Sequence, residues 1–148
     1  MKTKWSLNEL ARYRDEPLML TGEIDVEEEL KARSQQVIAI APVEVDGALT
    51  VDGTEYILYV NLSYTLTLLS SRSLEPVDVT MNLPVSEVYL PADEQPNSDE
   101  ERDVLLIELE QDWIDLKEIL VDNILVALPS YVLTKEEKEG KEQSTANC

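Results

Sequence analysis

The sequence predicts an α+β domain: an antiparallel β-sheet, meandering and partly barrel-like, packed by N- and C-terminal helices. Two observations predict it. Apolar and polar residues alternate through residues 43–51, 57–68 and 77–83, which is the period of half-buried strands. Helix-capping motifs stand before residues 7–14 and 116–127, outside this block of strands. The predicted strands follow one another in the sequence, with one helix before them and one after them. This order favours a sheet with one face covered by the two helices.

A capping box at Ser6 and Glu9 marks the start of the first helix. In such a box the serine hydroxyl accepts the glutamate amide, and the glutamate side chain reaches back to the serine amide. Trp5 and Leu10 stand at the two positions of a hydrophobic staple around it. Pro17 cannot continue a helix, so we expect the helix to end near residue 14.

The next elements are short. Residues 18–24 predict a strand, and Asp25 is placed to cap a single helical turn over residues 27–30. Residues 37–41 form an apolar run that stops at Pro42, which predicts another strand.

Three adjacent antiparallel strands follow, and they are the most strongly patterned part of the chain. Asp52-Gly53 suits a two-residue hairpin loop between the first two strands. Residues 70–76 turn the chain again, and residues 77–83 return as the third strand. The second strand places one apolar set on a single face: Leu58, Val60, Leu62, Tyr64, Leu66 and Leu68.

The last helix is predicted from Asp115 and Glu118, which form a second capping box. Pro129 ends the helix. The residues that recur at helical spacing along one face are Leu116, Ile119, Leu120, Asn123, Ile124 and Ala127.

Residues 1–133 are expected to form a single α+β domain. Within it, residues 91–103 predict a flexible acidic loop, and residues 104–109 a further strand. Docking of a basic partner on this loop is left open. Residues 134–148 are charged and small, and we expect a disordered tail.

Composition favours a binding protein over an enzyme. The chain has 31 acidic and 12 basic residues, a net charge of −19, no histidine and one cysteine, Cys148. Such a surface opposes binding to a phosphate backbone and suits a basic partner. Histidine clusters, cysteine clusters and glycine-rich phosphate loops are all missing from the sequence, so we expect no catalysis, no cofactor and no metal. Without a long apolar run or an apolar leader, no membrane association is expected and the protein is placed in the cytoplasm.

Two segments together resemble the YceD-like family, which is associated with accumulation of large-subunit (23S) ribosomal RNA. One is the turn Ser70-Ser71-Arg72-Ser73-Leu74-Glu75-Pro76, and the other is the ending Ile114-Asp115-Leu116 to Leu125-Val126-Ala127-Leu128-Pro129. The resemblance extends from Trp5-Ser6-Leu7 to Leu128-Pro129. It implies a role in synthesis, processing or stability of that RNA, with a ribosomal protein or a large-subunit assembly intermediate as partner.

The chain departs from the family pattern at its cysteines. The family's turn usually has the form Cys-x-Arg-Cys-Leu-x-Pro, and a second cysteine pair often follows the C-terminal Leu-Pro. Serines stand at both positions of the first pair, Ser70 and Ser73, and residues 130–140 contain no cysteine. Serine hydroxyls do not replace thiolates on zinc, so we expect no metal here and a turn stabilised by packing alone.

The residues that the turn retains are candidates for partner binding: Arg72, Leu74, Glu75 and Pro76. In the alternative interpretation, Arg72 pairs with a neighbouring carboxylate, and Leu74 and Pro76 only shape the turn.

A second group of candidates lies near the two predicted helices: Lys4, Trp5, Arg12, Arg14 and Trp113. The tryptophans are expected to be packing anchors, and they would mark a binding surface if both were exposed. The basic residues, together with Lys2, could contact RNA weakly and in a salt-dependent way.

Three functions are therefore carried forward. The first is a non-catalytic assembly factor that binds a basic ribosomal protein or an assembly intermediate. The second is direct binding of ribosomal RNA through the basic N-terminal helix. The third, a hydrolase that uses paired carboxylates, would require a pocket in which two such groups converge.

Overall fold

The computed structural model describes residues 1–92, 94, 105–129 and 132–134. The predicted acidic loop over residues 91–103 and the predicted tail over residues 134–148 fall almost entirely outside these described residues. Within them, the α+β class and the largely antiparallel sheet are confirmed.

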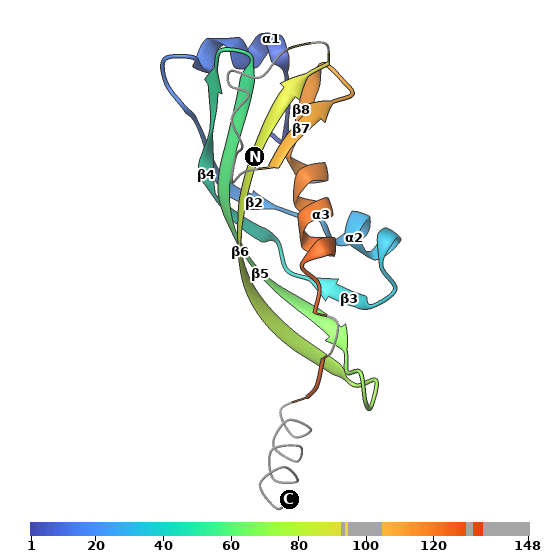
Figure 1. Ribbon diagram of the computed structural model, residues 1–148. Helices are drawn as coiled ribbons and strands as arrows, with labels where there is room; N and C mark the ends of the chain where they lie inside the picture. Colours follow the sequence, from blue (N-terminus) through green and yellow to red (C-terminus); the bar gives the residue numbers. More distant parts are fainter. Residues whose placement is uncertain (93, 95–104, 130–131, 135–148) are drawn as a thin grey trace, which may run out of the picture.

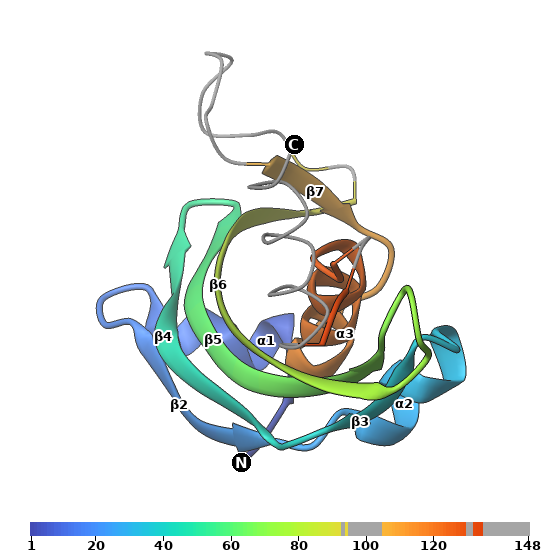
Figure 2. The ribbon, with the colours of Figure 1, turned by 90° about the horizontal axis from the view of Figure 1, so that it is seen from below.

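The main sheet curls around the C-terminal helix, α3 (Leu116–Val126), which lies on its concave side (Figures 1 and 2). Its strand order is β2-β4-β5-β6-β7, and β3 pairs with β5 beyond the end of β4. The strands are β2 (Leu18–Ile24), β3 (Val37–Ile40), β4 (Val43–Asp52), β5 (Glu55–Leu69), β6 (Pro76–Pro91) and β7 (Leu105–Leu109). The sheet does not close into a barrel.

The predicted alternation along β5 is confirmed. All six apolar side chains of its predicted inner face are buried, whereas Tyr59 on the outer face is 53% exposed. The same inner face meets Leu116, Leu120 and Ile124 of α3 in one hydrophobic cluster. Burial of this set is the main source of stability for the curved sheet.

The β4–β5 hairpin has the predicted position but a loop shifted by one residue. Asp52 pairs with Glu55, so the loop consists of Gly53 and Thr54. Gly53 has a φ of 61°, in the left-handed region that glycine adopts without a steric penalty. The turn chemistry therefore depends on the glycine, as predicted, and the aspartate ends the strand.

The strand predicted at residues 77–83 is too short, because β6 continues through Pro84 to Pro91. Proline is tolerated at the edge of a sheet, where one side of the backbone needs no partner. β7 pairs with β6 only from Glu87 onward, so β6 is an edge strand at Pro84 among the described residues.

The prediction of an all-antiparallel meander is wrong at its last strand. β7 runs parallel to β6, with Glu87 opposite Leu105 and Pro91 opposite Leu109. Parallel neighbours require a crossover of about a dozen residues, and residues 92–104 supply that length.

Both N-terminal helical segments begin close to where they were expected. The Ser6–Glu9 capping box is present, but α1 (Leu7–Leu10) is short and continues as a 3₁₀ turn, η1 (Ala11–Tyr13). α2 (Glu27–Arg33) is longer than the predicted single turn. Asp25 accepts the amide of Glu27, as a capping side chain would, although Val26 is the N-cap residue.

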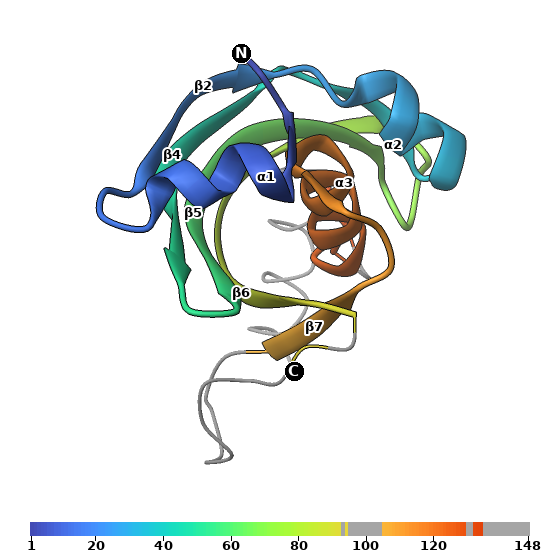
Figure 3. The same cartoon turned by 90° about the horizontal axis from the view of Figure 1, so that it is seen from above.

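A second, two-stranded sheet, which the sequence analysis did not predict, joins the N-terminal segment to the segment just before α3. β1 (Lys4–Ser6) pairs with β8 (Trp113–Asp115), and Trp5 lies opposite Ile114 in the core. This pairing places α1 across the end of the curved sheet where α3 begins (Figure 3). α3 itself is capped by the Asp115 side chain, as predicted. No helix among the described residues is long and apolar enough to span a membrane.

Candidate functional site

The turn between β5 and β6 is closed by hydrogen bonds that converge on Ser70. This serine is fully buried, and its hydroxyl accepts the amides of Arg72 and Ser73, each at 3.2 Å. Its own amide donates to the Glu75 carbonyl at 2.7 Å. The expectation that packing alone stabilises the turn is therefore wrong, because the buried hydroxyl supplies the two acceptor contacts.

The same turn places an apolar side chain in solvent. Leu74 has a φ of 63° and is 67% exposed, and Arg72 and Glu75 beside it are also exposed. A left-handed conformation costs a non-glycine residue about 1 kcal/mol. Arg72 has no ion-pair partner among the described residues, which removes support from the alternative that it pairs with a neighbouring carboxylate.

The two candidate tryptophans, Trp5 and Trp113, differ in their exposure to solvent. Trp5 is only 7% exposed and packs in the core, so its indole is not available to a partner. Trp113 is 38% exposed, and the Lys4 ammonium lies 4.2 Å from the centre of its ring. This distance is typical of a cation–π contact. The two tryptophans therefore do not form an exposed pair.

The basic side chains near the first helix are mostly engaged within the protein. Lys2 forms an ion pair with Glu9. Arg14 donates to the carbonyl oxygen of Gly53 at 2.8 Å. Arg12 is exposed on the 3₁₀ turn. These contacts reduce the cationic surface that the N-terminal segment offers to a phosphate backbone.

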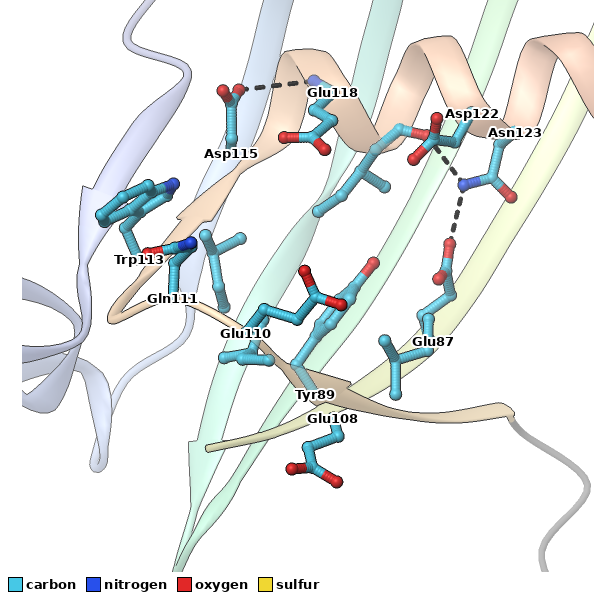
Figure 4. Close-up of a pocket in the computed structure, with 14 residues that line it drawn as sticks. Glu87, Tyr89, Glu108, Glu110, Gln111, Trp113, Asp115, Glu118, Asp122 and Asn123 are labelled. Carbon is cyan, nitrogen blue, oxygen red and sulfur yellow. Dashed lines mark hydrogen bonds between the residues drawn. The ribbon is translucent and has the colours of Figure 1, made fainter. Parts of the chain in front are cut away.

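An acidic groove lies between the β6–β7 pair and α3, with β8 at one end (Figure 4). Its volume is about 300 Å³, and among the described residues no lysine or arginine lines it. Apolar side chains, including Ile107, Ile114 and Ile119, form part of its wall. Six carboxylates line it: Glu87, Glu108, Glu110, Asp115, Glu118 and Asp122.

The carboxylates differ in what they contact. Asp115 accepts the amides of Lys117 and Glu118 at the start of α3, and Asp122 forms an ion pair with Arg33. Glu108, Glu110 and Glu118 are exposed and have no ion-pair partner among the described residues. In Figure 4, Glu110 and Glu118 lie over the groove, whereas Glu108 points away from α3. The groove thus retains negative charge that the surrounding protein does not neutralise.

At its inner end the groove contains two buried polar groups. Glu87 is only 9% exposed, and its Oε1 accepts the Asn123 side-chain amide at 2.7 Å. Tyr89 is 4% exposed, and its hydroxyl has no hydrogen-bond partner in the described structure. Burial raises the pKa of Tyr89 well above its usual value, with smaller contributions from the negative charge of Glu87 and from the closeness of its side chain to the Tyr89 hydroxyl. Burying a carboxylate without a cation, or a hydroxyl without a hydrogen-bond partner, destabilises the folded protein unless a further group bonds to it.

Sequence analysis did not identify this groove. Its residues come from separate elements that meet only in the folded chain, and Glu87 lies in the part of β6 that was not predicted as strand. Asn123 is the one feature of the sequence that could have pointed to the groove, since it is a polar residue on the otherwise apolar face of α3. The described residues contain no group of three or more carboxylate, cysteine or histidine side chains arranged to hold a metal ion.

The fold and the groove define an acidic α+β protein with an open, carboxylate-lined surface. A family model described as "Large ribosomal RNA subunit accumulation protein YceD" matches residues 58–148, more than half of the chain. The chain belongs to this family, which confirms the resemblance drawn from the turn and the C-terminal helix. The segment around Trp5 lies outside the match. No curated protein and no solved structure matches the chain.

Proposed function

We propose that this protein acts in the cytoplasm as a non-catalytic factor in ribosome biogenesis. It supports the accumulation of large-subunit ribosomal RNA by binding a basic ribosomal protein or an assembly intermediate. The family assignment supports the link to the ribosomal RNA, and the acidic groove supports the kind of partner.

The groove is the observation that carries this proposal. Glu108, Glu110 and Glu118 have no ion-pair partner among the described residues, and a net charge of −19 surrounds them with further negative potential. Such a field attracts Lys- and Arg-rich polypeptide and repels phosphate. The apolar wall formed by Ile107, Ile114 and Ile119 gives the aliphatic stems of those side chains a surface to cover.

The turn at Ser70–Pro76 is proposed as a second contact. Arg72 and Leu74 are exposed at the far end of the long β5–β6 hairpin, and Leu74 keeps a strained conformation there. Strained exposed residues concentrate at functional positions.

Affinity capture from cells, followed by identification of the bound proteins, tests the proposal. The native protein should recover large-subunit ribosomal proteins at moderate salt, and Glu108→Gln/Glu110→Gln/Glu118→Gln should recover far less. The matched control is Glu23→Gln/Glu44→Gln/Asp46→Asn, which removes the same charge from exposed positions of β2 and β4. Equal recovery by both variants would place the contact outside the groove, and recovery of no ribosomal protein would reject the proposal.

Direct binding of ribosomal RNA through the N-terminal segment is the second candidate. Arg12 and Arg72 are the exposed cations that favour it. Replacing Lys2, Lys4, Arg12 and Arg14 with glutamine should abolish binding to ribosomal RNA fragments if this candidate is correct. Unchanged binding would reject it. Hydrolysis by a carboxylate pair stays a remote candidate, and the family description names no reaction.

A further inference from the structure

The inner end of the acidic groove places the Tyr89 hydroxyl close to the Glu87 carboxylate, and no lysine or arginine of the described residues lines it. Glu87 is buried with a single described hydrogen bond, from Asn123, and the Tyr89 hydroxyl has none. Tyr89 extends from β6 into the space between the strands and α3, toward the side on which Glu87 and Asn123 meet (Figure 4). A buried carboxylate is stable when a hydrogen-bonding cation accompanies it.

Resting on the function proposed above, we infer that this inner end receives the guanidinium of one arginine side chain from the basic partner. The guanidinium donates to Glu87 and to the Tyr89 hydroxyl oxygen, and the exposed Glu110 and Glu118 attract the cations on either side of that arginine. Glu110 lines the same groove as Tyr89, and its exposed side chain is free to rotate as the arginine enters.

The chemistry of the two acceptors selects arginine over other cations. A guanidinium carries five N–H donors in one plane, so it can bond to a carboxylate and a phenol oxygen at the same time. A lysine ammonium is more strongly hydrated, which makes its transfer to this buried position less favourable. A divalent metal ion would need several carboxylate oxygens around it, and the described residues contain no such group.

Fluorescence anisotropy with labelled synthetic peptides tests the inference. The probe has four lysines alternating with glycines around one central arginine, and two matched peptides carry lysine or citrulline in its place. At about 0.1 M salt the native protein should bind the arginine peptide about tenfold more tightly than either matched peptide, because one buried, charge-assisted contact is lost.

Two variants locate the preference. Tyr89→Phe should reduce the arginine-to-lysine preference to about threefold or less, and Glu87→Gln should abolish it while leaving an acceptor for Asn123. Glu44→Gln, which removes an exposed charge on β4, should leave the preference unchanged. Tyr89→Phe removes a hydroxyl that lies close to the Glu87 carboxylate, so thermal unfolding of this variant checks that it remains folded.

The outcomes separate this inference from the function on which it rests. Equal binding of the three peptides, no binding of any of them, or a full arginine preference in Tyr89→Phe would overturn the inference. Capture of ribosomal proteins from cells by the native protein could still succeed in each case. If capture fails while the preference is lost in Tyr89→Phe and Glu87→Gln, the arginine site stands and the partner is a different basic protein.

Discussion

Ser71 and Val132 are joined by two hydrogen bonds across a separation of 61 residues in the chain. The Ser71 amide donates to the Val132 carbonyl at 2.6 Å, and the Val132 amide donates to the Ser71 hydroxyl at 2.8 Å. These bonds attach the segment that follows α3 to the turn between β5 and β6. In the family pattern described above, the turn usually carries one cysteine pair, and a second pair often follows the C-terminal Leu-Pro. The hydrogen bonds thus join, without any cysteine, two regions that a zinc site would join.

Replacing the serines of this turn should lower stability in a graded way. Ser71→Ala removes one of the two bonds to Val132 and should cost about 1 kcal/mol. Ser70→Ala leaves the amides of Arg72 and Ser73 without their buried acceptor and should cost about 2 kcal/mol. Urea unfolding measures both, with Ser86→Ala on the exposed face of β6 as the control. A Ser70→Ala variant as stable as that control would contradict the role assigned to the buried hydroxyl.

At position 74, glycine should give a more stable folded protein than alanine. The φ of 63° at Leu74 penalises any Cβ, and the leucine side chain is too exposed to contribute much packing. Leu74→Gly should therefore be more stable than Leu74→Ala by up to about 1 kcal/mol, the reverse of the order at an ordinary strand or helix position. Thermal unfolding of the two variants checks this, and the usual order would show that the turn relaxes.

A side chain at Gly47 should disrupt the β4–β5 pair. A Cβ at this position would lie 2.0 Å from the Tyr59 carbonyl oxygen and 2.5 Å from the Val60 Cα atom. Backbone atoms cannot move aside without breaking the strand register, so Gly47→Ala should cost about 3 kcal/mol or prevent folding. Ala48→Gly, at the next position, should cost about 1 kcal/mol. Denaturant unfolding compares them, and similar costs would contradict the close approach.

Tyr64 should make the protein less stable at high pH. Burial raises the pKa of Tyr64 to about 12, above its usual value of 10.0. Because the folded pKa is the higher one, its stabilising contribution is complete below pH 10.0 and is lost as the pH rises through about 12. Relative to Tyr64→Phe, the native protein should lose about 2 kcal/mol over that interval. Unfolding curves of both proteins measure the difference, and a difference that does not change with pH would contradict the assignment.

The elements that the sequence predicted well are those with a strong local cause. The Ser6–Glu9 box, the Asp115 cap and the glycine of the β4–β5 loop each depend on contacts within a few residues. The alternation along β5 persists because one face is buried along the whole strand. A shift of one residue would move every one of those apolar side chains into solvent.

The errors arose where distant residues decide the conformation. The strand predicted at residues 77–83 continues past Pro84, which is accommodated because β7 does not cover that part of β6. The β1–β8 pair joins residues more than a hundred positions apart, and neither strand has enough residues to show a period. Trp5 packs in the core opposite Ile114, as expected of a packing anchor, and this position removes it from the candidates for partner binding.

The sequence by itself determined the α+β class, the inner face of β5, the capped ends of the helices, the acidic character and the resemblance to the family. Tertiary structure decided the parallel β6–β7 pair, the hydrogen bonds between Ser71 and Val132, and the groove where Glu87, Tyr89 and Asn123 meet. The physical reason is the range of the interactions. Periodicity and capping act between neighbours in the chain, whereas the groove exists only because α3 lies against β6 and β7 once the sheet has curled.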